Sequence, residues 1–200
     1  AYLLHDFLPS PTQTPVWELA ANLDAEDQIA VFCSFSKVTF GGGGLAFAAA
    51  GKKLFDLLSR QRASMIVCPD KVNQMRHLEF LKDKAGVLEH MEKHAEIVRP
   101  KFEVAFKALD VLSPEIGSYQ KPTGGYFISY DAKRPIARRV IELCKEVGVL
   151  ITPAGSTYPH FHDPLDSNIR LAPTFLGVED LEDAMEVFVT AIMIAHQELD

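Results

Sequence analysis

A chain of 200 residues is long enough for one sizeable core or for parts of two smaller ones. Hydrophobic residues make up 48% and charged residues 24%, which is ordinary for a soluble globular protein. The net charge of −7, without a basic block, argues against nucleic acid or an anionic membrane surface as a partner. No apolar run approaches about 18 residues, so we predict no membrane span.

The first part of the chain alternates short apolar runs with amphipathic stretches, which is typical of an α/β fold. Asp70 is the expected N-cap of one helix. In order, we expect a proline-rich loop with a short helix, two strands buried on both faces, and two amphipathic helices: residues 8–28, 29–33, 45–50, 52–62 and 71–83.

The longest periodic segment runs from Gly86 to about Leu112. Its apolar residues recur at steps of three and four, which predicts one helix with a single buried stripe. Pro100 should kink this helix. A long kinked helix is a candidate connector between two domains.

After Pro114 the pattern changes to short strands and helices, which predicts an α+β arrangement. Gly124 and Gly125 should form a turn. The expected elements are then three strands, with a helix after the first of them and an amphipathic helix at the end: residues 126–130, 149–152 and 169–172 for the strands, 134–147 and 178–199 for the helices.

The cysteines and histidines indicate neither a disulfide framework nor a metal site. Cys33, Cys68 and Cys144 lie far apart and have no zinc spacing, so we expect reduced thiols in a cytoplasmic protein. His160 and His162 lie close to an aspartate, but no further ligand cluster accompanies them. We interpret that stretch as a solvated loop.

Lys37 stands between two apolar runs, after Ser34 and Ser36 and before four glycines at 41–44. A lysine at the end of a buried strand should be neutral or covalently capped, because burying its charge is costly. A neutral amine suits Schiff-base chemistry, for which pyridoxal phosphate is the commonest carbonyl partner. Serine hydroxyls and glycine N–H groups suit its phosphate. The alternative is a plain glycine turn with Lys37 extended into solvent.

Arg170 lies within a predicted apolar strand, where an arginine needs a specific partner. Its planar fork can bind a carboxylate at two points, which suits a substrate. A structural ion pair with an aspartate or glutamate is the alternative.

Four stretches together carry a resemblance to a known family: Ser36–Phe40, Asp70–His77, Gly124–Ser129 and Asn168–Phe175. They resemble fold-type-I pyridoxal-phosphate aminotransferases, and within these the MocR-like branch that includes the subgroup Ic aspartate aminotransferases. The resemblance runs along nearly the whole chain. It implies a homodimer that moves an amino group from an amino acid, aspartate, to a 2-oxo acid, 2-oxoglutarate.

The resemblance also implies roles for individual residues. Lys37 would form the Schiff base and move the proton in transamination. Tyr2 would donate to the phenolate oxygen of the cofactor, and Ser34, Ser36 and Thr39 would bind its phosphate. For the substrate, the implied residues are Arg170 on the α-carboxylate and Asn168, which would hold the geometry of the loop.

One position departs from the wider family. Most members have a phosphate-binding arginine eight residues after the lysine, where this chain has Leu45. Lys71 and Asn73 are the candidates to replace it, because the family brings a loop of the neighbouring subunit to this place.

The same resemblance implies how the chain is divided. Residues 1–83 would be the end of the large cofactor-binding domain, and 86–200 the small domain, with 86–112 as connector. The family places an aspartate three residues before the tyrosine matched by Tyr2, which here falls before Ala1. We therefore expect this sequence to be the C-terminal part of a longer enzyme.

Two alternatives share the cofactor lysine. One is the effector domain of a MocR-type transcription regulator, which would carry an upstream helix-turn-helix. The other is a pyridoxal-phosphate lyase or decarboxylase on the same fold, which assays with different amino acids would separate.

Overall fold

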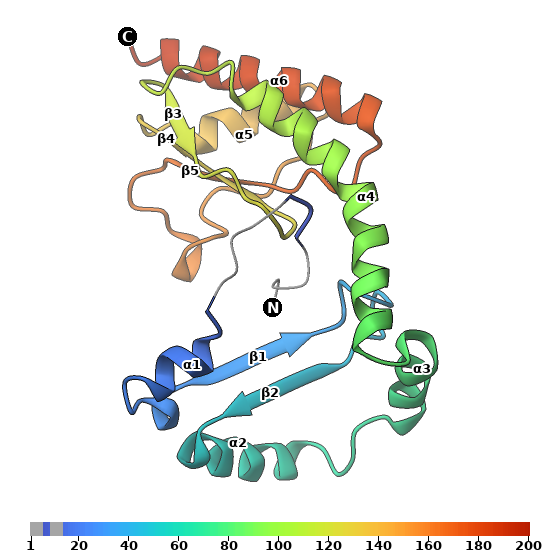
Figure 1. Cartoon of the computed structure of the whole chain (residues 1–200). Coiled ribbons are helices and arrows are strands. Elements are labelled where there is room, and N and C mark those ends of the chain that lie inside the picture. Colours follow the sequence, from blue (N-terminus) through green and yellow to red (C-terminus); the bar gives the residue numbers. More distant parts are fainter. Residues whose placement is uncertain (1–5, 9–13) are drawn as a thin grey trace. The chain divides into compact units, whose positions relative to one another are not determined.

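The computed structural model describes residues 6–8 and 14–200. These form two compact units, shown in Figure 1: one takes in residues 14–92, the other 6–8 and 93–200. The division falls within one long helix. The assignment of 1–83 and 86–200 to a large and a small domain stays a prediction.

An antiparallel hairpin is the centre of the first unit (Figure 1). Its strands are β1 (Ala30–Ser34) and β2 (Ala46–Ala50), which pair from Ala30 opposite Ala50 to Ser34 opposite Ala46. Helical elements precede and follow it: α1 (Val16–Ala21), η1 (Glu26–Gln28), α2 (Lys52–Met65) and α3 (Lys71–Leu81). Asp70 caps α3 as predicted, because its carboxylate accepts from the Asn73 N–H at 2.9 Å.

The expectation that these two strands are buried on both faces is wrong. Phe32 in β1 is 60% exposed and Phe47 in β2 is 51% exposed. In the described residues β1 and β2 pair only with each other, so no further strand covers their outer edges. An apolar run predicts a strand correctly, but it does not show how many neighbours that strand has.

The predicted long helix is confirmed as α4 (Lys84–Leu109), with Pro100 inside it. Its expected stripe is also confirmed, because six apolar residues of α4 are buried: Met91, Ala95, Phe102, Ala105, Phe106 and Leu109. No helix in the described ranges is long and apolar enough to cross a membrane.

The second unit is built on a three-stranded antiparallel sheet in the order β3-β4-β5. The strands are β3 (Gly117–Tyr119), β4 (Ile128–Ala132) and β5 (Asn168–Leu171). Around it lie the other helical elements of this unit, α5 (Ala137–Glu146), η2 (Pro159–Phe161) and α6 (Val178–Gln197) (Figure 1). Side chains alternate between the two faces of the sheet, so one face is apolar and packs on the helices.

The core of this unit lies between the apolar face of the sheet and the helices. Tyr130 of β4 meets Phe188 of α6 edge to face at 6.0 Å, and burial raises the pKa of Tyr130 to about 12. Phe102 of α4 packs on Phe7 at 4.2 Å. The predicted inner side of α6 is buried as expected: Leu181, Met185, Phe188, Ile192 and Ala195.

Two details of the second unit differ from the prediction. Residues 149–152 form no strand, although three of the four are β-branched. In the part of the chain that the structure describes, this segment has no ladder with a neighbouring strand, and extended residues without a ladder are not a strand. The three-residue β3 was not foreseen, because Gly117-Ser118-Tyr119 has no apolar alternation.

Candidate active site

The turn that carries Lys37 joins β1 to the glycine segment 41–44. The backbone N–H groups of Val38 and Thr39 both donate to the Phe35 carbonyl, at 2.9 and 3.0 Å. Farther along, the Phe35 N–H donates to the Leu45 carbonyl at 2.8 Å, which returns the chain to β2. Lys37 therefore lies at the tip of a closed, hydrogen-bonded turn.

Ser36 and Gly44 pass each other at close range in this turn. A Cβ atom on Gly44 would lie 2.5 Å from both the nitrogen and the Cα of Ser36, so a side chain has no space there. The Ser34 hydroxyl donates to the Ser36 hydroxyl at 3.0 Å and accepts from the Ser36 N–H at 3.1 Å. The Ser36 hydroxyl keeps its own hydrogen for a further acceptor.

Lys37 is exposed rather than placed at the end of a buried strand. This corrects the sequence expectation, and the cause is the open hairpin on which it stands. Val38, directly after it, is 2% exposed and anchors the turn from below. The exposed lysine is thus followed directly by a buried residue that holds the turn in place.

The other predicted cofactor residues lie at different places. The Asn73 amide of α3 donates to the Gly43 carbonyl at 2.8 Å, within this chain. Thr39 is half-buried beside the turn, while Lys71 is exposed at the start of α3. Tyr2 lies outside the described residues. The structure therefore gathers Ser34, Ser36, Thr39 and Asn73 around the turn of Lys37.

The second unit holds the predicted substrate residues on the polar face of its sheet. Arg170 pairs with Ser129 of β4, and Asn168 pairs with Asp131. The Asn168 amide donates to the Ser129 hydroxyl at 2.8 Å and to the Asp131 carboxylate at 2.7 Å, and it accepts from Thr157 at 2.7 Å. Asn168 joins the strands to the preceding loop, and its expected role in the substrate site stays a prediction.

Asp163 closes the loop that leads into β5. It is only 4% exposed, and its carboxylate accepts backbone N–H groups of Leu165 at 3.0 Å, Ser167 at 2.8 Å and Asn168 at 2.9 Å. Burial acts to raise the pKa of Asp163, but these backbone donors outweigh it and hold the pKa below its ordinary value. Sequence reasoning placed this residue in a solvated loop and missed its function as a cap.

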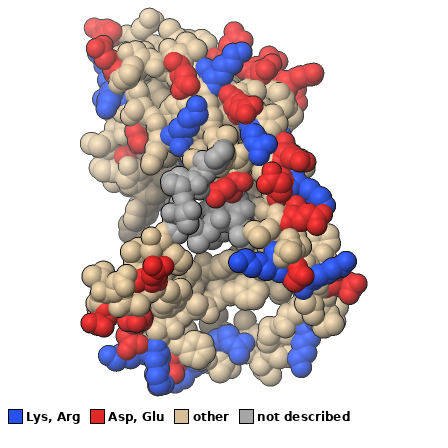
Figure 2. Space-filling view, in the orientation of Figure 1, with Lys and Arg blue, Asp and Glu red and all other residues tan. Residues whose placement is uncertain are grey.

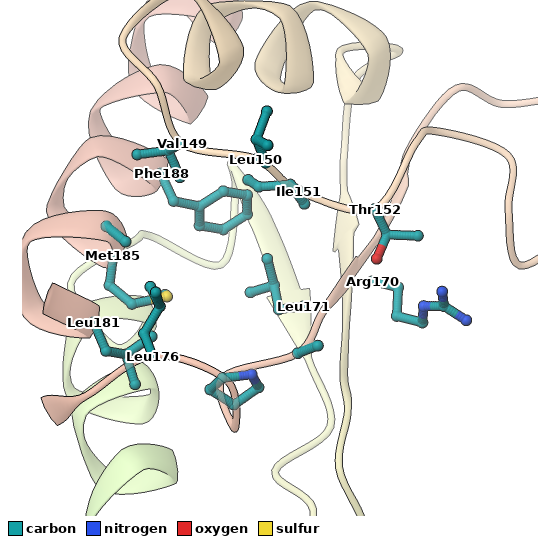
Figure 3. A pocket seen from close by; sticks show the side chains of 13 residues that line it. Val149, Leu150, Ile151, Thr152, Arg170, Leu171, Leu176, Leu181, Met185 and Phe188 are labelled. Carbon is teal, nitrogen blue, oxygen red and sulfur yellow. The ribbon is translucent and has the colours of Figure 1, made fainter. Parts of the chain in front are cut away.

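Arg170 projects from β5 away from the apolar core. Figure 3 shows Leu171 directed toward Phe188, and Arg170 on the opposite side. The guanidinium lies over the Phe127 ring, 4.9 Å from its centre. Its Nε is buried and has no hydrogen-bond partner among the described residues, where no carboxylate pairs with Arg170 either. The alternative of a structural ion pair is therefore not observed in this part of the chain.

A small cavity of about 130 Å³ lies beside Arg170, between segment 149–152, the end of β5 and α6 (Figure 3). Its lining is mainly apolar, with Leu176 and Met185 on one side. In Figure 3 the Thr152 hydroxyl is turned toward Arg170.

Charged side chains are mixed over the protein surface in the view of Figure 2, where Lys and Arg lie among Asp and Glu. Several of these form exposed ion pairs, such as Arg139 with Glu198 at 2.7 Å, which ties α5 to the end of α6. Such exposed pairs contribute little to stability individually.

The comparison with protein families decides the identity of the chain. The family model described as aspartate amino-transferase matches residues 1–199. The chain belongs to this family. An aspartate aminotransferase of Corynebacterium glutamicum is 40% identical over 169 residues, which cover 84% of this chain and 39% of that protein.

Solved structures show the same fold. A crystal structure of an aspartate transaminase from Corynebacterium glutamicum superimposes with a TM-score of 0.90 at 34% identity, over 99% of this chain and 47% of that one. The α-aminoadipate aminotransferase LysN of Thermus thermophilus, complexed with N-(5'-phosphopyridoxyl)-L-leucine, gives a TM-score of 0.81 at 24% identity, over 98% of this chain and 49% of LysN. The fold is that of fold-type-I pyridoxal-phosphate aminotransferases, as predicted. The chain spans less than half the length of these relatives.

Proposed function

We propose that this chain supplies the reactive lysine and the substrate-binding arginine of a pyridoxal-phosphate-dependent aminotransferase. Membership of the aminotransferase family supports the reaction class. The observation that carries the proposal is Arg170, whose guanidinium is held over Phe127 with a buried, unpaired Nε. A buried donor without a partner is costly, so a substrate carboxylate is the fitting partner.

The residues around Lys37 fit pyridoxal phosphate. Gly44 lets the chain pass close to Ser36, and the Ser36 hydroxyl at this place retains a hydrogen for a phosphate oxygen. Lys37 would hold the cofactor, Ser34, Ser36 and Thr39 would bind its phosphate, and Tyr2 would contact its ring oxygen. When bound, pyridoxal phosphate supplies a carbonyl group and a ring that accepts electrons.

The side chains of this protein then have two tasks. The Lys37 amine would remove the proton from the substrate α-carbon as general base and deliver it to the carbonyl carbon of the cofactor as general acid. Arg170 holds the α-carboxylate by two parallel hydrogen bonds, and the stacked Phe127 ring keeps the guanidinium plane in place.

The finer assignments are also part of this proposal. The four stretches that resemble the MocR-like branch support subgroup Ic, and the Corynebacterium glutamicum aspartate aminotransferase supports aspartate and 2-oxoglutarate as substrates. We place the enzyme in the cytoplasm as a homodimer, in which Lys71 of the second subunit takes the place of the arginine missing at Leu45. Asn73, the other candidate, would act from its own subunit, where it binds the Gly43 carbonyl. The comparisons do not favour the regulator or the lyase.

Replacing Arg170 with lysine in the full-length enzyme tests the proposal. Lysine keeps the charge but loses the two-point contact, so kcat/KM should fall about 10- to 100-fold, the value of one charge-assisted hydrogen bond. Because every amino acid and 2-oxo acid substrate has the α-carboxylate, the loss should be equal for aspartate and 2-oxoglutarate. The matched control is Arg138→Lys on the exposed side of α5. Unchanged kcat/KM for both substrates would remove Arg170 from the site.

A further inference from the structure

His77 is the one buried polar side chain of the described part of α3. It is 3% exposed, and in this helix only Leu81 is buried as well. A buried imidazole requires hydrogen-bond partners, because an unpaired polar group inside a protein is costly. The hydrogen-bond partners of the His77 ring indicate its role.

The two ring nitrogens of His77 make different contacts. Nδ1 lies 2.9 Å from the Asn73 carbonyl, which can only accept, so Nδ1 carries a hydrogen and donates. Nε2 lies 2.7 Å from the Thr39 hydroxyl. In the neutral ring Nε2 is then the acceptor, so the one hydrogen of the Thr39 hydroxyl is shared between Nε2 and the Phe35 carbonyl, which lies 3.1 Å away. The helix thus fixes one nitrogen, and the other nitrogen binds the turn that carries Lys37.

Thr39 is a suitable position at which to hold that turn. Its backbone N–H donates to the Phe35 carbonyl at 3.0 Å, and its hydroxyl lies 3.1 Å from the same carbonyl. Phe35 and Thr39 are the two ends of the turn, and Lys37 is its middle residue. A contact to the Thr39 side chain therefore acts on the bond that closes the turn.

Aromatic packing and two further hydrogen bonds fix the same segment. The rings of Phe35 and Phe40 lie 6.3 and 5.2 Å from the His77 ring, one from each side of Lys37 in the sequence. Asn73, one helical turn before His77, binds the Gly43 carbonyl at 2.8 Å. His90 of α4 donates through Nε2 to the Val38 carbonyl at 2.6 Å. Asn73 and His90 bind backbone carbonyls of the segment, whereas His77 reaches from α3 to a side chain of the turn.

We propose that His77 is a positioning residue for Lys37, which it serves by holding the Thr39 hydroxyl and thereby the turn between Phe35 and Thr39. The inference rests on the proposed function of Lys37. Lys37 is exposed on this turn, and the backbone of the turn sets the point and the direction from which its side chain leaves. Without the bond to Thr39, the turn opens more often and the amine is less often in the reactive orientation.

Two substitutions of His77 separate positioning from general packing. The terminal amide of His77→Gln reaches as far as Nε2 and retains the contact with Thr39. The amide of His77→Asn matches Nδ1, so it keeps the bond to Asn73 and loses Thr39. Thr39→Val removes the same bond from the other side with little change in shape, and the exposed Glu79→Gln on the same helix is the control.

The experiment uses the full-length enzyme and two readouts. In protein freed of cofactor, hydrogen exchange of the amides in residues 35–44 should be about fivefold faster in His77→Asn and Thr39→Val, the factor that one hydrogen bond supplies. The rate at which added pyridoxal phosphate becomes fixed to Lys37, followed by borohydride reduction, should fall by a similar factor. In His77→Gln both the exchange rate and the rate of cofactor fixation should lie close to wild type. The double variant His77→Asn/Thr39→Val should exchange no faster than either single variant.

The outcomes distinguish the two proposals. A wild-type enzyme in which no pyridoxyl group is found on Lys37 contradicts the proposed function, and the role of His77 with it. A labelled wild type in which His77→Asn and His77→Gln exchange and react alike overturns the positioning role only. If His77→Asn does not fold, the hydrogen exchange of Thr39→Val in protein freed of cofactor decides in its place, because phosphate binding by Thr39 does not enter that readout. An exchange rate equal to that of the control would contradict the inference.

Discussion

The two units of this protein achieve order by different means. In the second unit Phe102 and Phe188 are at most 1% exposed, within one core that the sheet and the helices share, although Phe161 and Phe175 on its surface are 76% and 92% exposed. In the first unit Phe32 and Phe47 are each more than half exposed, on a hairpin without further strands in the described residues. Burial fixes one unit, whereas specific polar contacts fix the functional turn of the other.

This difference matters for the proposed function, because Lys37 lies in the first unit and Arg170 in the second. Arg170 stands on a strand whose other face belongs to the core, so packing determines its position. Lys37 stands on an exposed turn, and its position depends on hydrogen bonds from α3 and α4. Changes in the two units should therefore affect different properties.

The largest effect should follow from Lys37→Arg in the full-length enzyme. Arginine keeps a positive charge but cannot form the Schiff base or move the proton. Turnover should therefore fall by about 10²- to 10⁴-fold. Thermal stability should hardly change, because Lys37 is exposed. The control is Lys145→Arg on the exposed side of α5. Turnover that remains within a few-fold of wild type would exclude Lys37 from catalysis.

A paired core substitution tests the contrast between the units directly. Phe102→Ala should lower the free energy of unfolding by about 3–5 kcal/mol, because it removes a fully buried ring. Phe32→Ala, at a 60% exposed position, should change it by no more than about 0.5 kcal/mol. Urea unfolding of the 200-residue chain measures both. Equal losses in the two variants would contradict the comparison.

Asp163→Asn should have an intermediate effect that depends on pH. The folded pKa of Asp163 lies below its ordinary value of 3.8, so its charged form stabilises the fold above that pH. At neutral pH the free energy of unfolding of the variant should be lower than that of wild type by about 1.5–3 kcal/mol, the value of hydrogen bonds to a charged group. As the pH falls through the folded pKa of Asp163, wild type loses this contribution, so the difference in the free energy of unfolding between wild type and Asp163→Asn should narrow. A constant difference from pH 7 to pH 2 would exclude the charged cap.

The smallest effect is a difference in alkylation rate between two cysteine thiols of the unmutated protein, which reports how deeply each is buried. Burial raises the pKa of Cys144 to about 11, whereas Cys68 is exposed. At pH 8 iodoacetamide should therefore modify Cys68 first and Cys144 only after unfolding. Peptide mapping by mass spectrometry shows the order. Early modification of Cys144 would mean that the core of the second unit opens readily.

The sequence predicted those parts of the fold that depend on periodicity. Helices α4 and α6 followed from apolar residues at steps of three and four, and the same residues form the core. Residues 149–152 misled the prediction, because β-branched residues favour extended backbone whether or not a partner strand is present. The burial of β1 and β2 was predicted wrongly for a related reason, because the sequence of one strand does not determine how many strands lie next to it.

The candidate site was predictable only where its residues form a local motif. Lys37 with its serines and glycines, and Arg170 in an apolar strand, stand out in the sequence. His77 binds Thr39 across 38 positions, and Asp163 caps backbone groups that any residue possesses, so neither leaves a pattern in spacing or composition. The i, i+4 spacing of Asn73 and His77 on α3 was the one available signal.

The most direct test of the central claim is borohydride reduction of the full-length enzyme with pyridoxal phosphate, followed by peptide mapping. The account predicts a single pyridoxyl group on the peptide that contains Lys37, and its loss in Lys37→Arg. A pyridoxyl group fixed to another lysine, with Lys37 unmodified, would contradict it.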